Sequence, residues 1–334
     1  MLPLIDRLRW QPPAPTPPRP VAQIMRDVLL ALVPGLLIQW WQFGVGVPIQ
    51  IGLCAGTAVL TEAAMLRLRG RASGPTLRDH SALVTALLLA LSLPPLAPWW
   101  VSVIGATFAM VFGKHLYGGL GHNPFNPAML GYAVLMVSFP KAMTFWPGAA
   151  ELQGTAFGVA DSVAAIFRGL PDGWIDALAR ATPLTAEHDF LITGTRSDAQ
   201  GTWGWRFINL GFGAGGLWLL HRRVIDRRLV LAFLAAVGLM ATAIDWALPG
   251  IYPGAAFHLF SGSTLLAAFF IVTDPVTAAT TPWARWLYGA GIGALVVVIR
   301  SFGGYPDGVA FAVLLMNVVA PTLDRYTRGR VYGH

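Results

Sequence analysis

Residues 229–248, LVLAFLAAVGLMATAIDWAL, form an apolar stretch that holds one charged residue, Asp245, and directly follows Arg227 and Arg228. A helix needs about 20 mainly apolar residues to cross a bilayer. Positively charged residues that flank such a helix stay on the cytoplasmic side of the membrane. The stretch therefore predicts a membrane-spanning helix that begins in the cytoplasm.

The same composition extends along most of the 334 residues, of which 55% are hydrophobic and only 12% are charged. An average soluble domain is about a quarter charged. This deficit favours a polytopic membrane protein over a soluble enzyme with one anchor. We expect ten membrane-spanning segments, at residues 28–43, 45–66, 81–96, 99–117, 128–139, 205–220, 229–248, 255–272, 286–299 and 309–323.

Fifteen of the 23 lysine and arginine residues lie in the N-terminal arm, in the loops after the second and sixth spans, and in the C-terminal tail. They are Arg7, Arg9, Arg19, Arg26, Arg67, Arg69, Arg71, Arg78, Arg222, Arg223, Arg227, Arg228, Arg325, Arg328 and Arg330. Ten spans place all four segments on one side, which the excess of positive charge makes the cytoplasm. Both termini are therefore expected inside. The net charge of +7 is explained by orientation in membrane lipid and indicates no nucleic-acid partner.

The same count places the polar insert 140–203 outside the cytoplasm, in the periplasm if the cell is Gram-negative. The insert holds seven of the 16 acidic residues. We divide the chain into a Pro-rich cytoplasmic arm, a first five-helix repeat, the extracytoplasmic insert, a second five-helix repeat and a cytoplasmic tail. These parts are residues 1–26, 27–139, 140–203, 204–324 and 325–334.

An internal repeat supports the division into two halves. Residues 117–124, YGGLGHNP, precede GYAVLM at 131–136, and residues 302–307, FGGYPD, precede AFAVLLM at 310–316. Five helices per half are an odd number, so the halves have opposite orientations, and functional sites are expected near their interface. Alternatively, helices rich in leucine and small residues resemble one another without a repeat. The predicted fold is an all-α polytopic membrane protein with about ten transmembrane helices in two inverted five-helix repeats and one extracytoplasmic loop insert.

The single cysteine, Cys54, lies in an apolar run. One thiol excludes an iron–sulfur cluster that this chain ligates with its own cysteines alone. The sequence also has no His-Glu-x-x-His motif, no histidine spacing typical of a metal site and no Gly-rich nucleotide loop between a strand and a helix. Any redox function therefore needs a different cofactor or a partner's cluster.

Residues 176–182, DALARAT, resemble the Asp-x-x-(Ser/Thr)-Gly-Ala-Thr signal at which a flavin transferase attaches FMN to the final threonine. Residues 261–280, 303–316 and 328–334 resemble the D subunit of the Rnf electron-transport complex, which is similar to the B subunit of the sodium-translocating NADH:quinone reductase. The resemblance implies a covalent FMN phosphoester on Thr182. Ala179 and Arg180 depart from the signal, and our hypothesis is that Arg180 pairs with the flavin phosphate.

From the residues alone, Thr182 and Pro183 also suit an ordinary helix N-cap followed by proline at the first helical position. This ordinary cap is the alternative to a flavin site. If a flavin is attached, a helix N-terminus or a cation would stabilise its phosphodiester.

A second flavin site is suggested by residues 121–128, GHNPFNPA. They resemble the stretch of the related reductase subunit whose asparagines contact riboflavin, which implies that Asn123 and Asn126 bind riboflavin or a second flavin. Their amides donate and accept hydrogen bonds. The alternative is a Pro-rich turn capped by asparagine. The topology places this loop on the cytoplasmic side, opposite Thr182.

Several charged residues lie within or beside apolar runs, where ionisable side chains are functional candidates. They are Glu62, Lys114, Asp245, Asp274, Arg300 and Asp307. Asp274 and Asp307 adjoin prolines at comparable places in the repeat, which suggests that both line an ion path.

The resemblance implies a membrane subunit of an ion-translocating ferredoxin:NAD oxidoreductase in the bacterial inner membrane, which relays electrons through FMN and is not catalytic alone. It also implies an extracytoplasmic FMN subunit and iron–sulfur subunits as partners, with a flavin transferase for maturation. The scaffold equally suits a solute channel or transporter without flavin. The departures at Ala179 and Arg180 leave open a flavin-free structural subunit.

Overall fold

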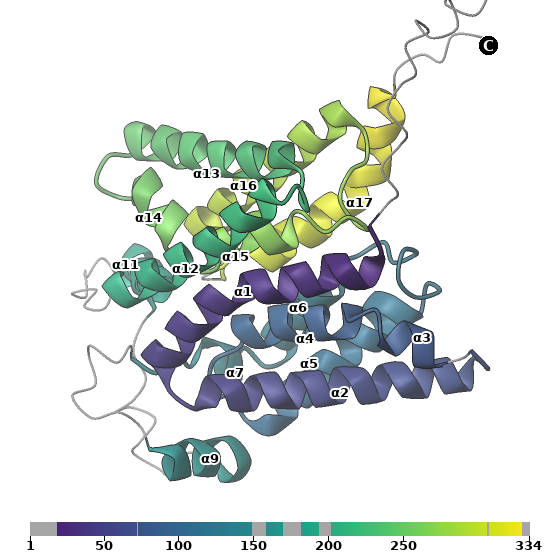
Figure 1. The fold of residues 1–334 in the computed structure, drawn as a ribbon. Helices are drawn as coiled ribbons and strands as arrows, with labels where there is room; N and C mark the ends of the chain where they lie inside the picture. The colour runs from purple at the N-terminus through teal and green to yellow at the C-terminus, as the bar shows by residue number, and fades with distance from the viewer. Residues whose placement is uncertain are drawn as a thin grey trace, which may run out of the picture.

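A computed structural model describes residues 19–71, 73–148, 158–169, 182–193, 202–305 and 307–328. Every regular element in these ranges is a helix (Figure 1). The first half contains α1 Val21–Phe43, α2 Gly46–Leu68, α3 Ser73–Leu77, α4 Ser81–Ser92, α5 Trp99–Phe108, the π-helix η2 Ala109–His115 and α6 Pro127–Ser138. The insert contributes α7 Pro140–Thr144, α9 Val159–Arg168 and α11 Pro183–Thr193. The second half contains α12 Thr202–His221, α13 Arg227–Ala247, α14 Ala255–Phe260, α15 Thr264–Leu266, the π-helix η3 Ala267–Ile271, α16 Pro282–Phe302 and α17 Val309–Thr327.

The all-helical membrane fold predicted from the apolar stretches is confirmed. Five helices, α1, α2, α13, α16 and α17, are long and apolar enough to cross a bilayer. Helices α4 and α6 are apolar but shorter. The other predicted spans are also helical over most of their length, and the count of ten crossings stays a prediction.

The predicted span 255–272 is not one continuous helix, because the chain breaks at residues 261–263 between α14 and α15. Gly262 adopts a φ of +60° there, which favours glycine. Asn209 of α12 satisfies backbone groups that the break releases. Its amide nitrogen donates to the carbonyls of Phe260 (3.2 Å) and Gly262 (2.9 Å), and its oxygen accepts from the backbone nitrogen of Leu265 (3.1 Å). Such compensation allows a broken helix at membrane depth.

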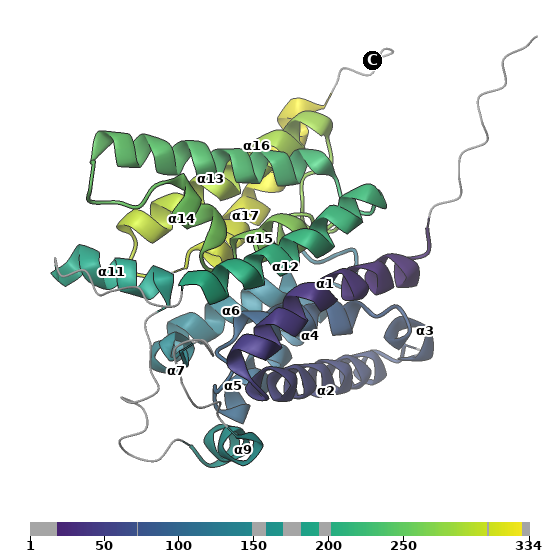
Figure 2. The ribbon, with the colours of Figure 1, turned by 60° about the vertical axis from the view of Figure 1, so that its left-hand side comes forward.

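The helices run between two ends of the bundle (Figures 1 and 2). We call one the basic end; it holds α3, the start of α1, the turn between α12 and α13 and the end of α17. The opposite end, which holds α9 and α11, is the insert end. An ion pair of 3.4 Å between Arg222 Nη2 and Asp27 Oδ2 joins the α12–α13 turn to the start of α1. The arginine-rich turns thus gather at one end, as the predicted orientation requires.

Corresponding helices pack in the same pattern within each half. Helix α2 packs against α4 and α5 as α13 packs against α14 and α16, and α5 packs on α6 as α16 packs on α17. Helix α1 joins the halves through a long contact with α12. The inverted relation between the halves stays a prediction.

Glycines bring α1 and α12 into close contact. A Cβ on Gly215 would lie 1.8 Å from the carbonyl oxygen of Ala31, and a Cβ on Gly35 would lie 2.2 Å from the ring of Phe212. Small residues at such crossings let helix backbones approach where burial from water supplies no driving force.

Replacing Gly215 with alanine is expected to lower the free energy of unfolding by about 1–3 kcal/mol, because the Ala31 backbone must move to admit the methyl group. Gly238 of α13 is the matched control, since a Cβ there meets nothing within 4 Å. Alanine at position 238 should stabilise the helix by up to about 1 kcal/mol. Thermal unfolding of both variants in detergent tests the contact; equal midpoints would contradict it.

Candidate functional site

Thr182 directly precedes α11 and caps its N-terminus. Its hydroxyl oxygen accepts a hydrogen bond of 3.1 Å from the backbone nitrogen of Thr185 and lies 2.8 Å from the Thr185 hydroxyl. Its carbonyl accepts from the Ala186 nitrogen at 2.8 Å. The predicted N-cap followed by Pro183 at the first helical position is therefore confirmed. Ala179 and Arg180 lie outside the described residues, so the pairing of Arg180 with a phosphate stays a prediction.

Thr182 lines a pocket between the two halves at the insert end, which we call the insert-end pocket. The pocket has an empty volume of about 850 Å³, its open mouth included. Small-molecule sites combine apolar walls with a few polar groups. The walls here are mostly apolar and come from α6, α12 and the segment after α7, with Met129, Met136, Trp146, Trp205, Ile208 and Phe212.

Three aromatic rings build one corner of this pocket. Trp146 and Trp205 both line the pocket, and their ring centroids lie 5.1 Å apart. Phe43, at the end of α1, packs edge-on against both rings, at 5.6 and 5.4 Å. Edge-to-face contacts of this kind hold large rings in fixed orientations. The corner is therefore a firm apolar surface.

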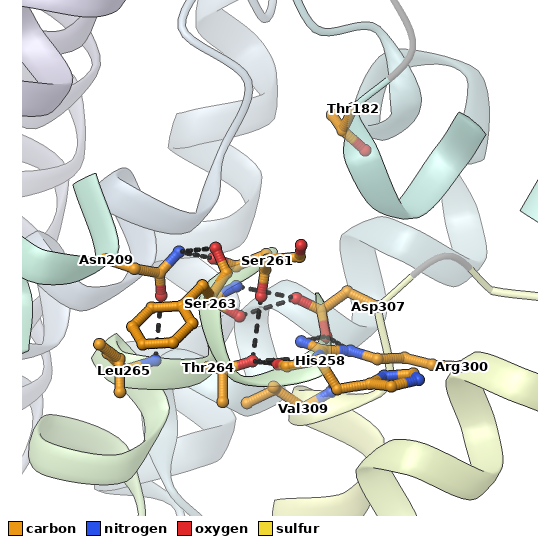
Figure 3. Close-up of polar contacts among 12 residues, drawn as sticks. Thr182, Asn209, His258, Ser261, Ser263, Thr264, Leu265, Arg300, Asp307 and Val309 are labelled. Carbon is orange, nitrogen blue, oxygen red and sulfur yellow. Dashed lines mark hydrogen bonds and ion pairs between the residues drawn. The ribbon is translucent and has the colours of Figure 1, made fainter. Parts of the chain in front are cut away.

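Asp307 and Ser263 are two of the polar residues that line the pocket, and Figure 3 shows their polar contacts. The Ser263 hydroxyl donates to Asp307 Oδ2 at 2.8 Å. The buried guanidinium of Arg300 donates to Asp307 Oδ1 through Nη2 (3.0 Å) and Nε (3.2 Å). The backbone nitrogen of Val309 donates to the same oxygen at 3.2 Å. Asp307 thus connects the broken helix, α16 and α17.

Arg300 also supports the broken helix directly. Its Nη1 donates to the carbonyl oxygen of His258 (3.0 Å) and to the hydroxyl of Thr264 (2.9 Å). Burial raises the pKa of the Asp307 carboxyl, but Arg300 and the hydrogen bonds from Ser263 and Val309 outweigh this effect and hold the pKa below its usual value. The pocket therefore has a carboxylate in its wall at neutral pH.

Asn126 caps α6 at the opposite end of the bundle, where its side-chain oxygen accepts from the Met129 nitrogen at 3.2 Å. The asparagine-capped turn that we weighed is therefore present. The Asn126 amide nitrogen also donates to Asp274 Oδ2 of the other half at 3.4 Å, and its backbone nitrogen donates to Asn317 Oδ1 at 3.1 Å. The structure thus brings together two of the predicted site residues, Asn126 and Asp274.

A second pocket, which we call the basic-end pocket, surrounds this contact and has an empty volume of about 770 Å³. It is lined by Lys114, Asn123, Asn126 and Asp274, together with the start of α1 and the α12–α13 turn. The buried side-chain oxygen of Asn123 has no hydrogen-bond partner among the described residues. Asp274 and Asp307, predicted to line one ion path, lie in different pockets at opposite ends.

A buried ion pair stands beside the basic-end pocket. Lys114 of η2 donates to the Glu62 carboxylate of α2 and, at 2.7 Å, to the hydroxyl of Ser81 at the start of α4. His115 Nε2 lies 3.6 Å from the same carboxylate. Glu62 and Lys114 are 0% and 1% exposed. Removing either charge would leave the other buried without a partner, which is strongly destabilising.

Sequence reasoning missed several residues that line the insert-end pocket, among them Gln39, Trp205 and Ser263. A signal was present for Gln39, since it is a polar side chain inside an apolar run. No comparable signal marks Trp205 or Ser263, whose roles depend on how α12 and the broken helix pack.

The chain also matches known proteins over almost its full length. The model of the NQR2, RnfD, RnfE family matches residues 11–333. The D subunit of the ion-translocating oxidoreductase complex from Yersinia pseudotuberculosis is 48% identical over 340 residues, which cover 95% of this chain and 95% of the relative. The D subunit of the same complex from Klebsiella pneumoniae is 48% identical, and the alignment covers 95% of this chain and 96% of the relative. The D subunit from Sodalis glossinidius is 49% identical, and the alignment covers 93% of this chain and 94% of the relative. This chain therefore belongs to the NQR2, RnfD, RnfE family.

Proposed function

We propose that the chain is the D-type membrane subunit of an Rnf ion-translocating oxidoreductase complex and relays electrons through FMN joined to Thr182. Relatives that carry this subunit name align with 93–95% of the chain. The observation that carries the flavin proposal is the half-buried Thr182 hydroxyl in the wall of the insert-end pocket.

The residues of the insert-end pocket fit a flavin ring. The walls of this pocket are mostly apolar and contain methionine, aromatic and aliphatic side chains. Gln39 lines the pocket, and its buried side-chain oxygen, Oε1, has no hydrogen-bond partner among the described residues. A flavin ring is planar and mostly apolar, which suits these walls, and its polar edge can supply the donor that Gln39 Oε1 lacks.

Each part of the site has a separate role in this proposal. FMN, when bound, supplies electron transfer in steps of one or two electrons. The Thr182 oxygen would form the phosphoester bond, and the positive end of the α11 helix dipole would stabilise the phosphate charge. The corner formed by Trp146 and Trp205 excludes water from the ring. Arg300 holds Asp307 in the wall as a carboxylate.

The basic-end pocket is the proposed site of a second flavin, held by Asn123 and Asn126. We further propose that the basic end faces the cytoplasm of a bacterial inner membrane and the insert end faces the periplasm. With flavins bound at both ends, the chain would exchange electrons with iron–sulfur subunits and an extracytoplasmic FMN subunit. Asp274 and Asp307 are proposed to bind the translocated ion near each flavin.

Denaturing gel electrophoresis under ultraviolet light tests the proposal with protein made alongside an active flavin transferase. The wild-type band is expected to fluoresce, whereas the band of Thr182→Val should be dark because no oxygen remains to form the ester. The control is Thr185→Val, which removes the neighbouring hydroxyl and should stay fluorescent. A dark wild-type band would contradict the flavin relay and would favour a flavin-free transporter or structural subunit.

A further inference from the structure

Gln39 of α1 lines the insert-end pocket and has an unpaired polar atom. The side chain is 3% exposed, and its Nε2 donates to the carbonyl oxygen of Leu91 at 3.1 Å. This hydrogen bond fixes which way the amide points, because a carbonyl accepts only from the nitrogen. Oε1 is left without a hydrogen-bond partner among the described residues.

A buried carbonyl oxygen without a donor costs about 1–3 kcal/mol. Other polar groups of the pocket are already engaged. The hydroxyls of Ser92 and Thr144 donate to carbonyls of their own helices, at 2.8 and 2.9 Å, and the Ser263 hydroxyl donates to Asp307. Because Gln39 lines the pocket, a molecule bound there can supply the donor that Oε1 lacks. A second hydrogen on Nε2 can donate to the same molecule.

We propose that Gln39 binds the pyrimidine edge of the flavin, with Oε1 accepting from the ring N–H and Nε2 donating to an adjacent ring carbonyl. This inference rests on the proposed function, because it concerns the same pocket. The flavin edge has an N–H flanked by two carbonyls, which matches an amide that offers one acceptor and one donor. A quinone ring has only acceptors and would leave Oε1 unpaired. Gln39 thus selects an isoalloxazine over a quinone.

The test compares Gln39→Leu with Gln42→Leu, in protein made alongside the flavin transferase. Gln42 lies one turn further along α1, is 2% exposed, and has an unpaired amide that does not line the pocket. Both variants should keep a fluorescent band on denaturing gels, because Thr182 is unchanged. A redox titration followed by visible absorption then measures the ratio of oxidised to reduced flavin at a fixed potential.

In Gln39→Leu this ratio should shift towards the oxidised form by about three- to tenfold, because the reduced ring carries more negative charge and loses the Nε2 donor. Loss of the Oε1 acceptor acts in the opposite direction but is smaller, because hydrogen bonds to charged groups are the stronger ones. A tenfold shift corresponds to about 30 mV for a two-electron couple. Gln42→Leu should titrate as the wild type does. A wild-type titration in Gln39→Leu, or an equal shift in both variants, would overturn the inference while leaving covalent attachment intact. A dark wild-type band would instead overturn the proposed function, and this inference with it.

Discussion

Replacing Lys114 with methionine is expected to lower the free energy of unfolding by about 3–5 kcal/mol, because the substitution leaves the fully buried Glu62 carboxylate without its cation. Most of this loss should come from the Glu62 charge that stays buried without a partner, and less from the lost attraction between Glu62 and Lys114. The double variant Glu62→Gln, Lys114→Met should therefore be more stable than Lys114→Met alone. Thermal or denaturant unfolding in detergent, followed by tryptophan fluorescence, measures both effects.

The matched control for Lys114 is Arg222→Met at the ion pair with Asp27. The Arg222 side chain is 42% exposed, and exposed pairs contribute about 0–1 kcal/mol. If Lys114→Met were no more harmful than Arg222→Met, the buried pair would not hold α2 and η2 together as described.

Arg300→Met should have an effect of similar size, about 3–5 kcal/mol. Arg300 donates to Asp307, to the His258 carbonyl and to the Thr264 hydroxyl, so its loss strands one carboxylate and releases the broken helix. The pocket wall beside Thr182 should loosen with it. Limited proteolysis and thermal unfolding of the purified chain measure the change.

Arg300→Lys is the graded control, because lysine keeps the charge but cannot reproduce the planar guanidinium fork. We expect a loss between those of the wild type and Arg300→Met. Equal stability of Arg300→Lys and the wild type would show that only charge matters at this position. Equal stability of Arg300→Met and the wild type would contradict the assigned role of Arg300.

The long apolar helices and the helix cap at Thr182 could be predicted from the sequence. Residues 229–248 and the other long apolar runs predict helices because backbone groups in lipid must bond within their own segment. The cap at Thr182 also follows from a local rule, since threonine before proline suits the start of a helix. These features depend on neighbours within one helical turn.

Contacts between distant helices could not be predicted in this way. In a membrane protein, helix faces towards lipid and towards the core are both apolar, so periodicity does not reveal which face packs inward. Glu62 and Lys114 are 52 residues apart and Asn126 and Asp274 are 148 apart, yet each pair is in contact. The break at residues 261–263 likewise depends on Asn209, which belongs to another helix.

The two pockets contain the residues that the proposed electron relay would use. One contains the half-buried Thr182 hydroxyl and the other contains Asn123 and Asn126, and they lie at opposite ends of one bundle between the same two halves. A relay that crosses a membrane needs a carrier near each face. The arrangement of the two pockets is consistent with the electron relay that we propose.

Mass spectrometry of the chain, purified from cells that contain an active flavin transferase, tests the central claim most directly. The account predicts an intact mass increased by one FMN less one water, with the addition located on the peptide that contains Thr182. An unmodified mass, or an addition on any other residue, would contradict the claim that Thr182 carries the flavin of the insert-end pocket.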